Sequence, residues 1–321
     1  MQRSFPSLVK AFFRNPTRYP TPRAATVTFF TKPSLLFRPQ QQQQARMEST
    51  KSHYEAHTAG SYESAFFYQK GPYMEYLRGL VVKSFCLKDS TCRSGAAPVL
   101  VDIGGGTGNF TKLLLEEAPD LRAVVVDPFL VDSQDNEDRI EFVKESAEVF
   151  MEPAKEGSWR ENGYDFVLMK EVVHHFKDSD RVPIFRGMLE GLNQRHAVVF
   201  GKKIPSLLIV TRPQHDIDYP LWKEAKEVWT KNQPPVETFV KELKEAGFAE
   251  VQYITEPYPC KIALDRWCSM IKRRFWSTFS NFSDAELEAA CKTIEEAEVD
   301  RVDDDGNIHF QDRLLFIVAS R

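Results

Sequence analysis

The sequence predicts an α/β fold built on a doubly wound parallel sheet, and three observations lead to this prediction. Apolar runs of strand length alternate with helical patterns across residues 99–255. The first run, 99–103, ends in a glycine-rich turn that leads directly into a helical pattern. The second run ends at Asp127, an acidic residue 19 positions beyond Gly108. Strand, turn, helix and acidic strand end together outline a nucleotide-type pocket at the carboxyl edge of the sheet.

The strands and helices follow from apolar runs, helical spacing and capping residues. The expected strands cover residues 99–103, 121–126, 139–143, 164–169, 206–210, 249–254 and 314–319. Ser179 is expected to cap the helix after the fourth strand, and Gly247 to end the helix after the fifth. About sixty residues separate the last two strands, and two helices are expected there, the second opening with a capping box at Ser283. This insertion is expected to cap the substrate.

Residues 1–47 have the composition of a targeting segment. They hold eight basic residues, and the first acidic residue of the chain is Glu48. Residues 7–14 can form a short basic amphipathic helix, which favours a mitochondrial presequence over a plastid transit peptide. The alternative is that this segment is a basic tail without a targeting role and that the protein is cytoplasmic. The glutamines at 40–44 suggest a low-complexity linker, so folding is expected from residue 48.

Composition excludes several classes of function. The chain has 321 residues, 42% of them hydrophobic, which is enough for a sizeable core. Without the eight basic residues of the first segment, 34 of the 42 Lys and Arg remain, against 46 Asp and Glu. The rest of the chain therefore has a net charge of about −12, which disfavours nucleic acid as a partner. No apolar run reaches 18 residues, so no transmembrane segment is expected. The five scattered cysteines predict neither a metal site nor a secreted protein.

Residues 54–85 carry aromatic side chains at helical spacing before the first strand of the sheet. They can pack against the sheet, or they can form a lid whose aromatic residues wall the active site. Tyr62 and Tyr68 are the candidate substrate contacts of such a lid.

The glycine-rich turn and the strand ends supply the candidate cofactor contacts. Glycines let the chain turn sharply and let a ligand approach the backbone. A carboxylate at Asp127 can bind both ribose hydroxyls, although a solvated turn aspartate is the alternative. Asp102, inside the first strand, is expected to bind backbone N–H groups of the turn. The full set is Asp102, Gly104, Gly105, Gly106, Gly108, Asp127, Pro128, Glu145, Ser146 and Lys170.

Two of these residues leave a second interpretation open. Glu145 and Ser146 follow the third strand, where the edge of an adenine ring would be recognised in this architecture. They can equally be an ordinary helix start with Ser146 as its cap.

These motifs resemble those of class I S-adenosylmethionine-dependent methyltransferases of the small-molecule, type-11-like group, over about 99–320. The resemblance is carried by residues 101–108, by the ribose-binding match at 125–128 and, less closely, by 145–147. Asn109 stands where a dinucleotide fingerprint has glycine, which disfavours NAD. The resemblance implies S-adenosylmethionine as cofactor and a Rossmann-like sheet of seven strands whose last strand is antiparallel.

The resemblance also implies a domain plan. The methyltransferase domain is expected over 48–321, with an N-terminal helical lid at 54–85 and a cofactor-binding core at 99–255. A helical substrate cap is expected at 256–307, and the last strand at 308–321.

Methyl transfer from a sulfonium requires mainly alignment of the acceptor and exclusion of water. A hydroxyl acceptor also needs a base, and His174 and His175, after the fourth strand, are the candidates; packing against the next helix is their alternative. Arg274 shares a predicted helix face with Trp267 and could bind a carboxylate, with Trp267 or Trp276 supporting a cation. A surface arginine and core tryptophans are the alternatives.

The most specific expectation is S-methylation of a small thioether acid, with O- and N-methylation as competitors. A non-catalytic methyltransferase-like protein that serves organellar assembly or binding is the rival from another class. A nucleic-acid methyltransferase is disfavoured by the negative charge and by the lack of an Asn/Asp-Pro-Pro-aromatic sequence at 170–173. The oligomeric state stays open.

Overall fold

The computed structural model describes residues 71–87, 97–130, 138–152, 163–193, 198–199, 202–203 and 206–321. All of them belong to one folding unit, residues 45–321. The predicted targeting segment, Tyr62 and Tyr68 lie outside the described residues.

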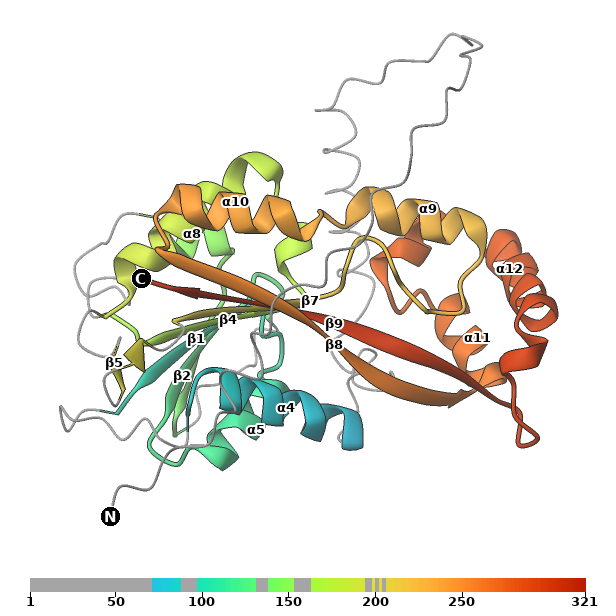
Figure 1. Cartoon of the computed structure of the whole chain (residues 1–321), viewed down its shortest axis with the longest axis horizontal. Coiled ribbons are helices and arrows are strands. Elements are labelled where there is room, and N and C mark those ends of the chain that lie inside the picture. Colours follow the sequence, from blue (N-terminus) through green and yellow to red (C-terminus); the bar gives the residue numbers. More distant parts are fainter. Residues whose placement is uncertain are drawn as a thin grey trace, which may run out of the picture. The chain divides into compact units, whose positions relative to one another are not determined.

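Seven strands form one mixed sheet in the order β3-β2-β1-β4-β7-β9-β8 (Figure 1). They are β1 (Val99–Ile103), β2 (Arg122–Val126), β3 (Ile140–Val143), β4 (Phe166–Lys170), β7 (Leu207–Thr211), β8 (Glu250–Ala263) and β9 (Asn307–Ser320). The first five of these strands in the chain pair in parallel, and β9 runs antiparallel to both β7 and β8. The predicted seven-stranded sheet with an antiparallel last strand is confirmed. A separate two-stranded ribbon joins β5 (Val198–Val199) to β6 (Lys202–Lys203).

Helices cover both faces of the sheet, with α8 and α10 on one side and α4 and α5 on the other (Figure 1). The α-helices described are α4 (Pro72–Ser84), α5 (Asn109–Glu117), α6 (Ala147–Phe150), α8 (Asp178–Gly191), α9 (Lys223–Asn232), α10 (Val236–Ala246), α11 (Leu264–Lys272) and α12 (Asp284–Ala297). Short 3-10 helices are η1 (Val173–His175), η3 (Ser277–Asn281) and η4 (Val299–Arg301).

The strands supply a core on each face because their side chains alternate. In β1, Leu100 faces the core that includes α4 and α5, whereas Val101 faces the core that includes α8 and α10. Both residues are fully buried, as expected of a strand covered on both sides.

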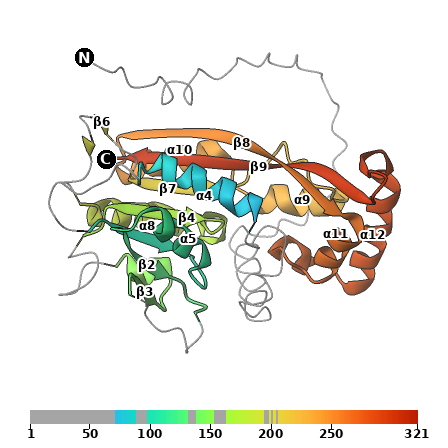
Figure 2. The same cartoon turned by 90° about the horizontal axis from the view of Figure 1, so that it is seen from below.

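Strands β8 and β9 are longer than the sequence patterns suggested. They pair continuously from Glu250 opposite Ser320 to Ala263 opposite Asn307, and extend past the parallel strands toward α11 and α12 (Figure 2). The expected ranges, 249–254 and 314–319, were therefore too short. The extension buries alternate side chains against the C-terminal helices, among them Ile262 and Phe310. Within the expected cap, residues 256–263 belong to a strand and helices begin at Leu264.

Capping residues explain several helix ends. Gly247, with φ of 112°, ends α10 as predicted, and Ser283 and Glu286 form the predicted capping box of α12. The prediction that Ser179 caps α8 was wrong. That helix begins at Asp178, and the Ser179 hydroxyl donates to Asp180 instead.

Candidate functional site

The glycine turn after β1 requires glycine for two different physical reasons. Gly104, Gly106 and Gly108 all have positive φ, between 54° and 74°. A Cβ at Gly104 would lie 2.6 Å from Val172, and one at Gly108 would lie 2.9 Å from Phe142. At Gly106 a Cβ would meet no described atom within 4 Å, so this residue faces open space. The turn thus presents an open side to a ligand while its ends are packed tightly.

Asp127 holds the turn from the end of β2. Its Oδ2 accepts from the Gly106 N–H at 3.0 Å, and its Oδ1 accepts from the Phe129 N–H at 2.8 Å. Burial raises the pKa of Asp127, and these two backbone hydrogen bonds oppose the shift. Each carboxylate oxygen keeps capacity for a further donor. The arrangement fits a ribose, because a fixed carboxylate stands beside the open side of the turn.

Asp102 has a different partner from the one expected. Its Oδ2 accepts from the Thr111 hydroxyl on α5, not from backbone N–H groups of the turn. The side chain is buried, and a Cβ at Gly105 would lie 2.7 Å from the same oxygen. Asp102 therefore packs against the buried side of the glycine turn. Burial raises its pKa to about 6, although Thr111 opposes the shift.

The residues after β3 show that Ser146 is a helix cap. Ser146 accepts from the Val149 N–H at 3.4 Å and begins α6. Glu145 beside it is exposed, as is Pro128 after β2. The ends of β2 and β3 are joined by a hydrogen bond from the Asp127 N–H to the Val143 carbonyl, 3.1 Å. Glu145 and Asp127 thus stand at the same carboxyl edge of the sheet.

Lys170 ends β4 on the other side of β1. Its Nζ lies 5.4 Å from the centroid of the Phe110 ring at the start of α5. Burial lowers its pKa, and the nearby carboxylates Glu171 and Asp102 oppose that shift. A cation is therefore held close to the glycine turn.

A pocket lies at the carboxyl end of β4, where Glu171 follows Lys170 in the chain. Its lining residues come from the end of β4, η1, the end of β7, α9 and η3; they are Glu171, His174, His175, Arg212, Trp229, Asn232, Gln233, Trp276, Ser277 and Thr278. The centroids of the His174 and His175 rings are 4.0 Å apart. Val172, in the same segment, is the residue against which Gly104 packs. The segment that lines the pocket with Glu171 and His174 thus also packs against the glycine turn.

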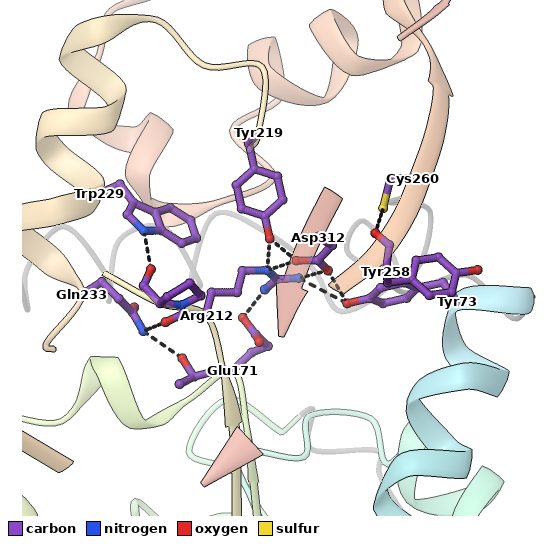
Figure 3. A network of polar contacts seen from close by, with 11 residues as sticks. Tyr73, Glu171, Arg212, Tyr219, Trp229, Gln233, Tyr258, Cys260 and Asp312 are labelled. Carbon is purple, nitrogen blue, oxygen red and sulfur yellow. Dashed lines mark hydrogen bonds and ion pairs between the residues drawn. The ribbon is translucent and has the colours of Figure 1, made fainter. Parts of the chain in front are cut away.

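A buried polar network surrounds Arg212 (Figure 3), and two of its members, Glu171 and Arg212, line this pocket. Arg212 Nε and Nη2 donate to the two carboxylate oxygens of Asp312 at 3.0 and 3.1 Å, and Arg212 Nη1 pairs with Glu171 Oε2. The hydroxyls of Tyr73 and Tyr219 both donate to Asp312. The network links α4, β4, β7 and β9 around one arginine.

Arg212 stays charged in this network, and its two tyrosines stay neutral. Burial lowers the pKa of Arg212, but the carboxylates of Asp312 and Glu171 outweigh it, so the pKa lies well above the usual value. Burial and the negative charge of Asp312 both raise the pKa of Tyr73 and of Tyr219 well above the usual value. Both phenols therefore stay protonated as donors.

Helix α4 lies within the segment 54–85 that was expected to pack against the sheet or to form a lid. Tyr73 and Leu77 of α4 are buried in the core, and the Tyr73 hydroxyl is occupied by Asp312. This part of segment 54–85 packs into the domain.

The two expected substrate contacts in the C-terminal insertion do not line the pocket. Trp267 is fully buried, and its Nε1 donates to the Pro220 carbonyl at 2.9 Å. Helix α11 ends at Lys272, so Arg274 does not continue its apolar face; it has φ of 54° instead. Arg274 donates to Asp284 and to a carbonyl, which joins the ends of α11 and α12. Trp267 and Arg274 thus have structural contacts, as the alternative interpretations stated, whereas Trp276 does line the pocket.

Several pocket residues were missed by the sequence reasoning. Arg212 directly follows the apolar run of β7, and a cation after a buried strand was an available signal. Asp312, which holds Arg212, occupies the inward position in the alternation of Ile308, Phe310 and Leu314; the domain plan placed it in the last strand at 308–321, but no role was predicted for it. Glu171 was noticed only as part of the fourth strand's end.

Comparison with known proteins supports the interpretation of this geometry. Residues 84–197 match the family described as methyltransferase domain. Over 120 residues the chain is 27% identical to eugenol O-methyltransferase of Ocimum basilicum, covering 37% of this chain and 29% of that enzyme. Over 95 residues it is 34% identical to isoflavone 4'-O-methyltransferase of Glycyrrhiza echinata, covering 29% and 23%. The chain thus spans less than a third of the length of these relatives.

The fold agrees with a solved structure. A putative methyltransferase from an antibiotic biosynthesis pathway of Anabaena variabilis superposes with a TM-score of 0.52 at 16% identity, covering 75% of this chain and 96% of that one. The family match and the fold agree with a methyltransferase domain over residues 84–197. The predicted resemblance to methyltransferases is thereby confirmed for residues 84–197.

Proposed function

We propose that this protein transfers the methyl group of S-adenosylmethionine to a hydroxyl group of a small molecule. The observation that carries this proposal is the position of His174 and His175, which line a pocket and belong to the segment that packs against the glycine turn. A hydroxyl needs a base to become a good nucleophile, and a histidine titrates near neutral pH. The bound cofactor supplies the electrophilic methyl group, and the chain's residues position the acceptor and take its proton.

Two further observations support a hydroxyl acceptor. The indoles of Trp229 and Trp276 line the pocket, and their flat apolar surfaces suit an aromatic ring. The two aligned relatives named above are O-methyltransferases by name, although the alignments span only part of each.

S-methylation of a thioether acid loses the support that Arg274 was expected to give. Arg274 is occupied by Asp284 and the Phe282 carbonyl, and the pocket arginine, Arg212, is occupied by Asp312 and Glu171. A substrate carboxylate would have to break one of these ion pairs. N-methylation stays as the alternative reaction, since the tryptophans could hold an ammonium group.

The test is transfer of a labelled methyl group by the full-length protein to a set of small phenols, thioether acids and amines. His174→Ala and His175→Ala each remove one candidate base. Loss of about 10²- to 10⁴-fold in kcat for a phenol in one variant, with S-adenosylhomocysteine binding retained, would support the proposal. Transfer to amines or thioethers but to no hydroxyl compound would contradict it.

The rival function is a non-catalytic organellar assembly or binding protein. Isothermal calorimetry of the full chain with S-adenosylhomocysteine addresses it, because the open glycine turn and Asp127 predict binding. Absence of binding would favour the rival.

We also propose that residues 1–47 direct the protein to an organelle, with the mitochondrion favoured over the plastid. The basic composition and the absence of acidic residues support this proposal. A fluorescent fusion of these residues that stays in the cytosol would contradict it.

A further inference from the structure

Glu171 occupies a special backbone position at the mouth of the pocket. It follows the last residue of β4 and has φ of 60°, in the left-handed region that a residue with a Cβ seldom adopts. Its N–H donates to the Val210 carbonyl at 2.8 Å, so the conformation is fixed from β7. Such conformations persist where the surrounding structure over-determines them, and they gather at functional sites.

The two carboxylate oxygens of Glu171 have different environments. Oε2 pairs with Arg212 Nη1. Arg212 cannot swing away easily, because Nε and Nη2 are held by Asp312 and the backbone carbonyl of Arg212 accepts from Gln233 at 2.6 Å. The orientation of the Glu171 carboxylate is therefore fixed.

The other oxygen, Oε1, is buried and accepts no hydrogen bond from any described residue. A buried polar atom without a partner is destabilising, and more so when it is charged, so such an atom calls for an explanation. Glu171 lines the same pocket as His174, His175 and Trp276. A ligand in this pocket is the partner that the geometry provides for.

We infer that Glu171 Oε1 determines acceptor specificity by accepting a hydrogen bond from a second hydroxyl of a hydroxylated aromatic acceptor. This inference rests on the proposed O-methylation. A histidine faces the hydroxyl that receives the methyl group, Glu171 binds its neighbour, and the ring lies against the indoles of Trp229 and Trp276. The acceptor is then a vicinal diol of the catechol class, and its mono-methylated product keeps one hydroxyl.

The test measures binding and does not depend on turnover. Catechol and its dimethyl ether, veratrole, are titrated into the full-length protein saturated with S-adenosylhomocysteine, and quenching of tryptophan fluorescence is followed. We expect wild type to bind catechol at least about tenfold more tightly than veratrole, since a hydrogen bond to a charged group contributes about 1.5–3 kcal/mol. Glu171→Gln should remove most of this preference, because its amide can accept from Arg212 and then turns a donor toward the pocket.

Glu242→Gln is the matched control. Glu242 also holds a buried arginine, Arg181, through two hydrogen bonds of 2.7 and 2.8 Å, but it lies outside the pocket. This variant should keep the preference for catechol. Equal binding of the two compounds by wild type, or an unchanged preference in Glu171→Gln, would overturn the inference. A preference for catechol without any methyl transfer would leave the inference standing and contradict the proposed function.

Discussion

Arg212 and Asp312 form a bidentate ion pair that joins the end of β7 to the middle of β9. Nε and Nη2 donate to the two carboxylate oxygens at 3.0 and 3.1 Å, and both side chains are buried. Two tyrosine hydroxyls and Glu171 complete the set of partners. The pair therefore fixes Arg212, which lines the pocket, through a residue 100 positions further along the chain.

Removing Asp312 should destabilise the protein strongly. Asp312→Ala leaves the buried Arg212 with one carboxylate, and breaking a buried pair costs about 3–5 kcal/mol. Urea denaturation followed by fluorescence measures this change. Glu288→Ala is the control, because its pair with Lys272 is exposed and should contribute little. Similar stabilities of the two variants would contradict the role given to the network.

Asp127 should contribute to cofactor binding. Asp127→Ala removes a carboxylate fixed beside the open side of the turn, and the loss of a charged hydrogen-bond acceptor is worth about 1.5–3 kcal/mol, or roughly 10- to 150-fold in affinity. Calorimetry with S-adenosylhomocysteine measures the affinity. Asp120→Ala, at an exposed turn, should bind as wild type does. Unchanged affinity in Asp127→Ala would remove this residue from the site.

Substitutions in the glycine turn should separate folding from binding. Gly104→Ala forces a Cβ to within 2.6 Å of Val172 and should lower the melting temperature more than Gly106→Ala does. Gly106→Ala carries only the cost of its positive φ, about 1 kcal/mol, yet fills space on the ligand side. It should therefore bind S-adenosylhomocysteine more weakly while staying folded. The opposite order of melting temperatures would contradict this assignment.

Asp102 should make stability depend on pH. Its pKa is raised from 3.8 to about 6 in the folded state, so the folded protein binds the proton more tightly than the unfolded chain does. Its contribution is then fully present below about pH 4 and is lost as the pH rises through 6. The free energy of unfolding of wild type, relative to Asp102→Asn, should fall by about 2–3 kcal/mol between pH 4 and pH 7. A difference that stays flat with pH would exclude the raised pKa.

Arg274 should act on stability rather than on substrate binding. Arg274→Ala removes the hydrogen bonds to Phe282 and Asp284 that join α11 to α12, so the melting temperature should fall slightly. The KM for any methyl acceptor should not change, because Arg274 does not line the pocket. A severalfold higher KM for acidic acceptors alone would restore its role as a carboxylate anchor.

Most of the candidate cofactor site could be predicted from local patterns in the sequence. Each of its features depends on residues that are close in the sequence. They are strands buried on both faces, glycines at positions of positive φ, and Asp127 at a strand end. The order of strands and helices then predicts the carboxyl edge where the cofactor binds. His174 and His175 were predicted as candidate bases from their place after the fourth strand.

The roles of the other pocket residues could not be predicted in this way, because they depend on tertiary contacts. Glu171 and Arg212 follow β4 and β7, whereas Asp312 lies in β9, and no spacing along the chain shows that they meet. The apolar pattern of α11 was visible, but the end of that helix at Lys272 turned Arg274 toward Asp284. Trp267 and Trp276 are chemically alike in sequence, yet one is fully buried and the other lines the pocket. Contacts between distant segments set these roles, and such contacts depend on how β8 and β9 extend beyond the parallel sheet.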